Sequence, residues 1–298
     1  MEMKWLKTFC VAAKYENFRQ ASEELFLTQP AITKHIQRLE VHLNQPLFER
    51  IGKSVVLTAA GHRFLPIATN IVTTYEQGIE DFEAWKQGYK RKLMIATAPQ
   101  IASSVLPPIM RRFMDENPDI ELIINVLNSY EIGEEISVGR ADLGLTRIRP
   151  VQSNIDCRIV HEEPVLLVAP PDERNGTPVD EETVLATYRV ITHNHPDYWD
   201  RLLPEIKRHY PNVRTMKVNQ IEITKRFIEQ GLGISYVPYT MVKEEVRTNR
   251  LTEIKPNKII PPHSTTYVLT KVMTEEADAF LVFLEEEIKK AGRTPAQP

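Results

Sequence analysis

The stretch that decides the fold runs from residue 18 to residue 61 and reads FRQASEELFLTQPAITKHIQRLEVHLNQPLFERIGKSVVLTAAG. Asn17 can cap a short helix whose apolar residues recur at intervals of three and four, the period that buries one helix face. Those apolar residues are Phe18, Ala21, Leu25 and Phe26. Thr28 then suits the N-cap of a second helix, in which Pro30 stands early enough to lose no helical hydrogen bond. The spacing predicts two helices joined by a tight turn over about residues 18–37.

The second helix has an apolar face and a polar face. Its predicted buried stripe consists of Ile32, Ile36, Leu39 and Leu43. The opposite face carries amide, hydroxyl and cationic side chains, which are the groups that base edges and phosphates accept. Residues 47–50 and 55–57 then flank a basic turn at 51–54, which predicts a short hairpin, the wing.

This order predicts a winged helix-turn-helix that holds its second helix in the major groove of double-stranded DNA. The predicted DNA contacts are Thr28, Gln29, Pro30, Thr33, Lys34, Gln37, Arg38, Arg50 and Lys53. On periodicity alone, a polar face that is merely solvated remains the alternative, because amphipathic helix pairs are common.

The residues themselves resemble the LysR-type transcriptional regulators. The matching runs are FRQASEEL at 18–25, TQPAITKHI at 28–36, LE at 39–40, PLFER at 46–50 and LTAAG at 57–61. Weaker matches follow in GRADLG at 139–144 and GLGI at 231–234. The resemblance therefore covers nearly the whole chain.

The resemblance implies a DNA-binding regulator that senses a small metabolite. It also implies a homodimer or homotetramer on a dyad-symmetric operator, with RNA polymerase as a further partner. Residues 192–199 and 214–218 further resemble the branch of this family in bacilli that represses citrate synthase, which implies control of a metabolic gene in central carbon metabolism.

Length, charge and cysteines fit this class. The chain has 298 residues and a formal net charge of -3, yet residues 1–63 carry nine Lys or Arg and only six Asp or Glu. A basic N-terminal segment can bind DNA phosphates, while the acidic remainder of the chain is repelled by them. Cys10 and Cys157 fall in segments assigned to different domains, so neither a disulfide framework nor a metal site is indicated. Because no secretory signal and no apolar run of membrane-spanning length occurs, the sequence predicts a cytoplasmic protein.

Residues 59–88 have the spacing of paired helices. Apolar or small residues recur at alternating intervals of four and three, which predicts a dimerisation helix. The members of this seam are Phe64, Ala68, Ile71, Tyr75, Gly78, Phe82 and Trp85. Pro66 is expected to bend the helix or remove a hydrogen bond, and Ile79 to fill the gap that Gly78 leaves. The alternative is a long helix packed on its own domain.

After a polar, basic segment at residues 87–92, predicted strands and helices alternate. This alternation predicts a parallel α/β sheet. We expect helices over 103–114 and 130–138, a second α/β unit that starts near Pro164 or Pro170, and a return strand over 266–271. The resemblance implies a two-lobed fold like that of the periplasmic binding proteins. The predicted domains are a DNA-binding domain at 1–58, the dimerisation helix at 59–88 and an effector-binding domain at 89–298. Within the last, lobe I covers about 92–162 and 266–295, and lobe II about 163–265.

Ligands of parallel α/β sheets collect at the carboxyl ends of the strands, beside helix N-termini that attract anions. That rule selects four loops and predicts a small organic anion as effector, with Arg147 pairing with its carboxylate. The predicted effector contacts are Pro99, Gln100, Ser103, Thr146, Arg147, Thr192, His193, Gln220 and Thr224.

Other functions find less support in the sequence. His193, His195 and Asp197 offer three metal-capable groups, but Pro196 interrupts them and no further ligand is spaced to close a site, so no metal and no other cofactor is predicted. No nucleophile motif occurs, so no catalytic residue is predicted either. The rival hypotheses are a metabolite-binding protein, or an enzyme with an N-terminal helical interaction domain.

Overall fold

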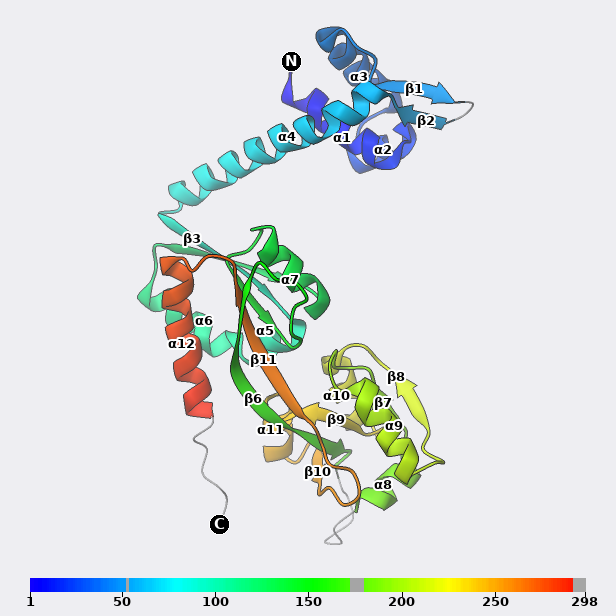
Figure 1. Ribbon diagram of the computed structural model, residues 1–298, viewed down its shortest axis with the longest axis vertical. Helices are drawn as coiled ribbons and strands as arrows, with labels where there is room; N and C mark the ends of the chain where they lie inside the picture. Colours follow the sequence, from blue (N-terminus) through cyan, green and yellow to red (C-terminus); the bar gives the residue numbers. More distant parts are fainter. Residues whose placement is uncertain (52–53, 172–179, 292–298) are drawn as a thin grey trace. The chain divides into compact units, whose positions relative to one another are not determined.

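The computed structural model describes residues 1–51, 54–171 and 180–291. The chain forms two compact units, an N-terminal unit of residues 1–88 and a C-terminal unit of residues 89–298 (Figure 1). None of the described helices is long and apolar enough to cross a bilayer.

The N-terminal unit contains four helices and one hairpin within its described residues. The elements are α1 (Met3–Tyr15), α2 (Phe18–Glu24), α3 (Gln29–Leu43), β1 (Phe48–Ile51), β2 (Ser54–Leu57) and α4 (Ala59–Lys86). The predicted caps are present, since the Asn17 side chain accepts from the backbone N–H of Arg19 and Gln20, and the Thr28 hydroxyl accepts from Ala31. The helix-turn-helix predicted from the capping pattern is therefore confirmed.

The core of this unit lies between α1, α2, α3 and the hairpin. Ile32, Ile36 and Leu39 are buried, as the spacing of the second helix predicts. Phe18 packs edge-on against Phe48 of β1, with ring centroids 5.3 Å apart. Aromatic contacts thus hold the hairpin against the helices. These contacts join residues far apart in the sequence, so the local sequence pattern does not predict them.

The prediction that Phe26 joins the buried stripe of α2 is wrong. Because α2 ends at Glu24, Phe26 lies beyond the helix, where its backbone has a φ of 52° and its side chain is 94% exposed. The N–H of Leu27 donates to the carbonyl of Ser22, and the N–H of Phe26 to that of Glu23. These two bonds form a Schellman motif, which requires a left-handed residue at this position.

The predicted seam of α4 divides into two halves. Ala68 is buried, and Phe64 and Ile71 pack against the core of their own unit. Lys7 of α1 forms an ion pair with Glu76 at 2.6 Å, so contacts with α1 reach the middle of α4. Lys7 also lies over the ring of Tyr75, and from this residue onwards the apolar seam residues Tyr75, Ile79, Phe82 and Trp85 are exposed. The first half therefore packs within the chain, and only the second half offers an unpartnered apolar stripe.

The C-terminal unit has two lobes that share a seven-stranded sheet, and lobe II contains a further two-stranded parallel sheet. Lobe I contains β3 (Arg91–Thr97), α5 (Pro99–Ser104), α6 (Leu106–Glu116), β4 (Ile120–Val126), α7 (Ser129–Ser137), β5 (Leu143–Thr146) and α12 (Glu275–Ala291). Lobe II contains α8 (Glu181–Thr187), β7 (Val190–Thr192), α9 (Trp199–His209), β8 (Thr215–Lys217), α10 (Ile221–Glu229), β9 (Ser235–Pro238), α11 (Tyr239–Arg247) and β10 (Thr252–Ile254). In lobe I, β3 pairs in parallel with both β4 and β5, as the alternating pattern predicts.

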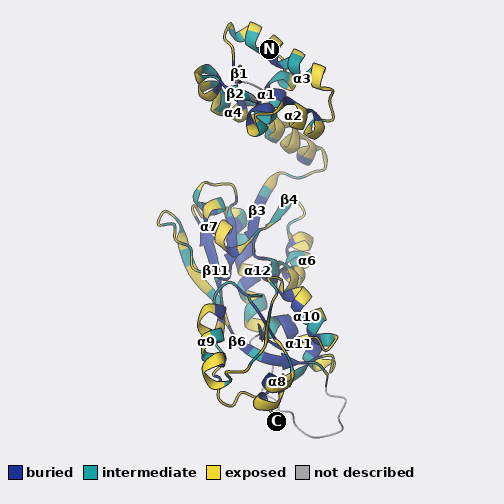
Figure 2. Ribbon diagram, turned by 90° about the vertical axis from the view of Figure 1, so that its right-hand side faces the viewer, coloured by how far each residue is buried: buried dark blue, intermediate teal, exposed yellow. Residues whose placement is uncertain are grey.

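Two long strands connect the lobes. They are β6 (Asp156–Ala169) and β11 (His263–Thr270), which pair antiparallel. β6 continues past Pro164 and then pairs with β9 and β10, so the main sheet has the order β10-β6-β11-β5-β3-β4, with β9 also on β6. Figure 2 shows β11 mostly in dark blue, and β6 is mainly buried in its second part, at residues 165–169, whereas most of its earlier residues are exposed or half-buried. The two-lobed α/β architecture is confirmed, and β11 corresponds to the return strand expected over 266–271.

One predicted helix is interrupted. Residues 103–114 were expected to form a single helix, but α5 ends at Ser104 and α6 begins at Leu106. Pro107 and Pro108 explain the break, because a proline removes a backbone donor and disfavours helical geometry in the residue before it.

Candidate functional site

The polar face of α3 is open to solvent. Thr28, Gln29, Pro30, Lys34, Gln37 and Arg38 are exposed, and Thr33 is half-buried. Five of these residues surround a shallow hollow on the helix, namely Gln29, Pro30, Thr33, Lys34 and Gln37. The Thr33 hydroxyl donates to the Gln29 carbonyl at 3.1 Å, which leaves its methyl group and an oxygen lone pair for a partner. The predicted contacts on α3 therefore lie on one surface.

The wing is tied to α3 by one carboxylate. Glu40 Oε1 of α3 accepts from the backbone N–H of Leu47 at 2.8 Å and of Phe48 at 3.1 Å. The Thr58 hydroxyl caps α4 by accepting from Gly61, and donates to the Pro46 carbonyl at 2.7 Å. Arg50 is exposed on β1, and Lys53 lies outside the described residues. Sequence reasoning missed the role of Glu40, although a carboxylate after a polar helix face, just before a hairpin, is a signal for such an anchor.

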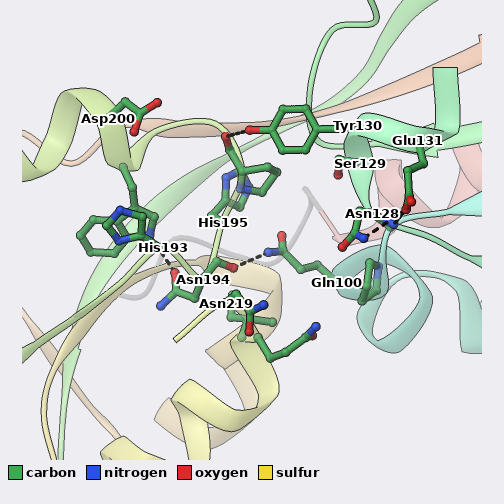
Figure 3. A pocket seen from close by; sticks show the side chains of 16 residues that line it. Gln100, Asn128, Ser129, Tyr130, Glu131, His193, Asn194, His195, Asp200 and Asn219 are labelled. Atoms are coloured by element: carbon green, nitrogen blue, oxygen red, sulfur yellow. Dashed lines mark hydrogen bonds between the residues drawn. The ribbon is translucent and has the colours of Figure 1, made fainter. Parts of the chain in front are cut away.

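A cavity of about 480 Å³ lies between lobe I and lobe II of the C-terminal unit. Its size falls in the range of small-molecule sites. It is lined by Ala98, Pro99, Gln100, Asn128, Ser129, Tyr130, Glu131, His193, Asn194, His195, Pro196, Trp199, Asp200, Asn219, Gln220 and Ile221. Figure 3 shows polar side chains from both lobes around this space. The N-terminal ends of α7 and α10 both border it, and the first N–H groups of a helix have no carbonyl partner within that helix.

Three hydrogen bonds join the lobes around the cavity. Gln100 Nε2 donates to the Asn194 carbonyl at 2.7 Å, and the Tyr130 hydroxyl donates to the Pro196 carbonyl at 3.0 Å (Figure 3). Beside them, the Ser103 hydroxyl donates to Glu222 Oε1 at 3.1 Å. A ligand in this cavity would therefore touch both lobes at once.

The charged groups of the lining are sparse. Among the described residues that line the cavity there is no Lys or Arg. Glu131 accepts from the N–H and the amide of Asn128 at 3.0 and 3.1 Å, so its carboxylate is occupied in capping α7. Asp200 is exposed in the first turn of α9. The cavity thus offers backbone and neutral donors in place of cationic side chains.

The predicted effector contacts separate into two groups. Pro99, Gln100, His193 and Gln220 line the cavity, and their role as effector contacts stays a prediction. The others lie outside the lining and have partners within the protein: Ser103 on Glu222, Thr146 on the Ser129 carbonyl, Thr192 on His193, Thr224 on Gln220 and Asn194, and Arg147 on Glu163. Sequence reasoning passed over residues 128–131, although the rule for strand ends, applied to β4, selects them.

Arg147 is part of a buried network at the crossing strands. It is fully buried, and its Nη1 donates to Glu163 Oε1 at 3.0 Å and to the hydroxyls of Ser264 and Thr266. Glu163 also accepts from the N–H and hydroxyl of Thr240, at 2.7 and 3.0 Å. The prediction that Arg147 holds an effector carboxylate is not supported by this arrangement, because the carboxylate beside it belongs to the protein.

His195 connects this network to the cavity. The N–H of Asp197 donates to its Nδ1 at 3.2 Å, so the proton of the neutral ring stands on Nε2, which donates to the Ser264 hydroxyl at 3.0 Å. Burial, and next the positive charge of Arg147, hold the pKa of His195 well below its usual value. Among the described residues, no three His, Cys, Asp or Glu side chains gather as a metal-binding group. The His195 ring is therefore neutral. It lines the cavity, and both of its nitrogens are hydrogen-bonded within the protein.

Comparison with known proteins agrees with this division into two sites. Residues 3–62 match the model of the bacterial regulatory helix-turn-helix protein, lysR family, and residues 86–289 match that of the LysR substrate binding domain. The chain is 41% identical to the HTH-type transcriptional regulator CitR of Bacillus subtilis (strain 168), over 95% of this chain and 98% of that protein.

Solved structures show the same fold. The crystal structure of full-length CbnR with its target DNA has a TM-score of 0.65 at 21% identity, covering 98% of this chain and all of that one. The structure of DarR of Vibrio fischeri with DNA has a TM-score of 0.64 at 22% identity, covering 96% of this chain and 99% of that one. Since both parts of the sequence match the family and a relative matches along almost the full length, the chain belongs to the LysR family of DNA-binding transcriptional regulators.

Proposed function

We propose that this protein binds a dyad-symmetric operator as a homodimer or homotetramer, with the polar face of α3 from each of two subunits in the major groove. The observation that carries the proposal is the pairing of a buried stripe, Ile32, Ile36 and Leu39, with an exposed polar face on the same helix. Because one recognition helix covers only a few base pairs, two subunits are needed for a specific site. The exposed apolar half of α4 supports pairing of the subunits.

The cavity of the C-terminal unit is the proposed effector site, with a small organic anion as its ligand. Support comes from the N-termini of α7 and α10, whose first-turn N–H groups favour negative charge, although in α7 the N–H of Glu131 is already bonded to Asn128. Because Lys and Arg are absent from the described lining, an effector with few carboxylates fits better than a highly charged one. A ligand that prefers one arrangement of the lobes shifts the protein towards that arrangement and changes operator binding.

The regulated gene is proposed to be a metabolic one, in central carbon metabolism, and the protein to act in the cytoplasm without catalytic activity. The similarity of residues 192–199 and 214–218 to the citrate-synthase branch of the family supports the choice of gene. The cavity supports binding without turnover, because the Ser264 hydroxyl that is bonded to His195 is fully buried and receives a hydrogen bond from the ring, so the ring does not activate it as a nucleophile.

Nuclease footprints on DNA upstream of the gene, with and without small organic acids, test this function. We expect a dyad-symmetric footprint whose length or strength changes with one of the acids. A footprint that no organic acid alters contradicts the proposed effector class, and an asymmetric footprint of a single half-site contradicts the paired α3 helices.

Variants of α3 test the assignment of individual contacts. We expect Gln29→Ala and Thr33→Ala to lower the preference for operator over random DNA, since base contacts carry specificity, each by about 1–3 kcal/mol. Lys53→Ala is expected to weaken binding to all sequences and to lower its salt dependence, as loss of a phosphate contact does. Equal losses on operator and random DNA for all three variants would contradict these roles.

A further inference from the structure

One side chain in the wall of the cavity has an unused hydrogen-bonding atom. Gln100 is only 7% exposed, and its amide nitrogen donates to the Asn194 carbonyl at 2.7 Å. Because that partner is a carbonyl oxygen, the amide can lie only with its nitrogen towards Asn194. The oxygen, Oε1, is buried and has no hydrogen-bond partner among the described residues.

Burying an acceptor in this position costs free energy unless a donor forms a hydrogen bond with it. A buried polar atom without a partner keeps the full penalty of losing its water, whereas a hydrogen bond removes that penalty. Figure 3 shows the Gln100 oxygen turned away from Asn194, towards the space that the other labelled side chains surround. Because this oxygen has almost no accessible surface, a molecule in the cavity that carries an O–H or N–H group supplies the missing bond once a neighbouring side chain moves aside.

The rest of the lining restricts what else this molecule carries. The N-termini of α7 and α10 border the same cavity and present N–H donors, which suit a carboxylate. Glu131 and Asp200 are the acidic side chains of the lining, and no Lys or Arg of the described residues balances them there. An ammonium group or a hydroxyl beside a carboxylate is compatible with such walls, whereas several unshielded carboxylates are not.

We propose that Gln100 selects the effector by accepting a hydrogen bond from it, so that the effector is a small carboxylic acid that also bears a hydroxyl or ammonium group. The inference rests on the proposed role of the cavity as the effector site. It assigns recognition of the donor group to Gln100 Oε1, and recognition of the carboxylate to the helix N-termini. The bond to Asn194 fixes the oxygen before the ligand arrives.

Calorimetric titration of the full-length protein with matched acids tests the proposal. Each set shares one carbon skeleton and differs in one substituent: propionate, lactate and alanine; succinate, malate and aspartate; glutarate, 2-hydroxyglutarate and glutamate. In at least one set we expect a substituted acid to bind about tenfold or more tightly than its unsubstituted parent. The comparison of hydroxy and amino acids shows which donor the site accepts.

A variant separates the role of Gln100 from a general effect on the lobes. Gln100→Met keeps the length of the side chain but has no comparable acceptor, so the ratio of affinities between substituted and parent acid should fall to about one. Glu222→Ala removes another bond between the lobes, the one with Ser103, without changing the lining. That control should keep the ratio of the unchanged protein.

The outcomes distinguish the inference from the proposed function. Equal affinity for parent and substituted acids in every set, or an unchanged ratio in Gln100→Met, overturns the inference but leaves an acid-sensing regulator in place. If no acid of any set binds, both the inference and the proposed effector class are overturned, while operator binding by α3, measured separately, is untouched.

Discussion

Among single side chains, His195 gives the most specific prediction of how stability depends on pH. Its ring is buried and stacks on Tyr198, with centroids 4.3 Å apart, and both of its nitrogens have partners. A proton added to Nδ1 would oppose the N–H of Asp197 and place a second positive charge near Arg147. Burial of the ring is the main reason why the pKa of His195 lies well below 6.5 in the folded protein, and the charge of Arg147 lowers it further.

The sign of the resulting pH dependence follows from linkage. In the unfolded chain His195 takes up a proton near pH 6.5, whereas in the folded protein it does so only at lower pH, so the unfolded state binds more protons in between. We therefore expect stability to fall as the pH drops below about 6.5, with a contribution from His195 of up to about 1.4 kcal/mol per pH unit. Thermal unfolding from about pH 7.5 to about pH 5.5 measures the slope.

A matched pair of variants isolates this contribution from that of the carboxylates. His195→Gln should flatten the acid side of the stability curve more than His209→Gln, which replaces an exposed histidine. Equal slopes in the two variants would mean that the imidazole of His195 is not the group responsible.

The same region shows how far local sequence can define a site. Gln100 and His193 were predicted because they follow strand ends, and the structure places both at the cavity. Arg147 follows a strand end too, yet it pairs with Glu163. That pairing depends on β11 lying between β5 and β6 in the sheet, a long-range arrangement that no periodicity in the sequence contains.

At the level of helices and strands, the turn after α2 stores strain. Phe26 occupies the left-handed position of a Schellman motif, which favours Gly or Asn, and its exposed ring gains little in return. We expect Phe26→Asn to stabilise α2 by about 1 kcal/mol, which slows local opening roughly fivefold. Hydrogen–deuterium exchange of peptides from α2 in the full-length protein measures this change.

Alanine at the same position is the control for Phe26. Phe26→Ala also removes the exposed ring but keeps a side chain that disfavours the left-handed conformation, so it should bring no comparable gain. If Ala and Asn slow exchange equally, the exposed aromatic ring and not the backbone conformation is the source of the effect.

Helices and strands could be predicted from the sequence where the residues that define them are close together along the chain. The caps Asn17 and Thr28 and the buried stripe of α3 depend on neighbours within one or two turns. By contrast, a second α/β unit was expected to begin near Pro164 or Pro170, but β6 continues through Pro164, because this proline lies at the end of the ladder with β11, just before the ladder with β9 begins at Val165. The missing N–H of the proline therefore interrupts neither ladder, a circumstance set by tertiary pairing.

For the molecule as a whole, the second half of α4 decides whether the subunits can act together. Phe82 and Trp85 stack on each other with centroids 5.7 Å apart, and both remain more than half exposed in the single chain. Such a continuous apolar stripe on a long helix is covered in paired helices. Association through it would bring two α3 helices to one operator, which a single subunit cannot do.

We therefore expect the double variant Phe82→Glu and Trp85→Glu to dissociate the protein, because charges in a helix-pairing seam are desolvated without partners. Affinity for a complete dyad should fall steeply, whereas binding to an isolated half-site should change little, since α3 is untouched. Val151→Glu is the control, because Val151 is 93% exposed in a loop of the C-terminal unit. Sedimentation velocity and gel-shift titration measure both effects, and a double variant that sediments like the unchanged protein would show that another surface joins the subunits.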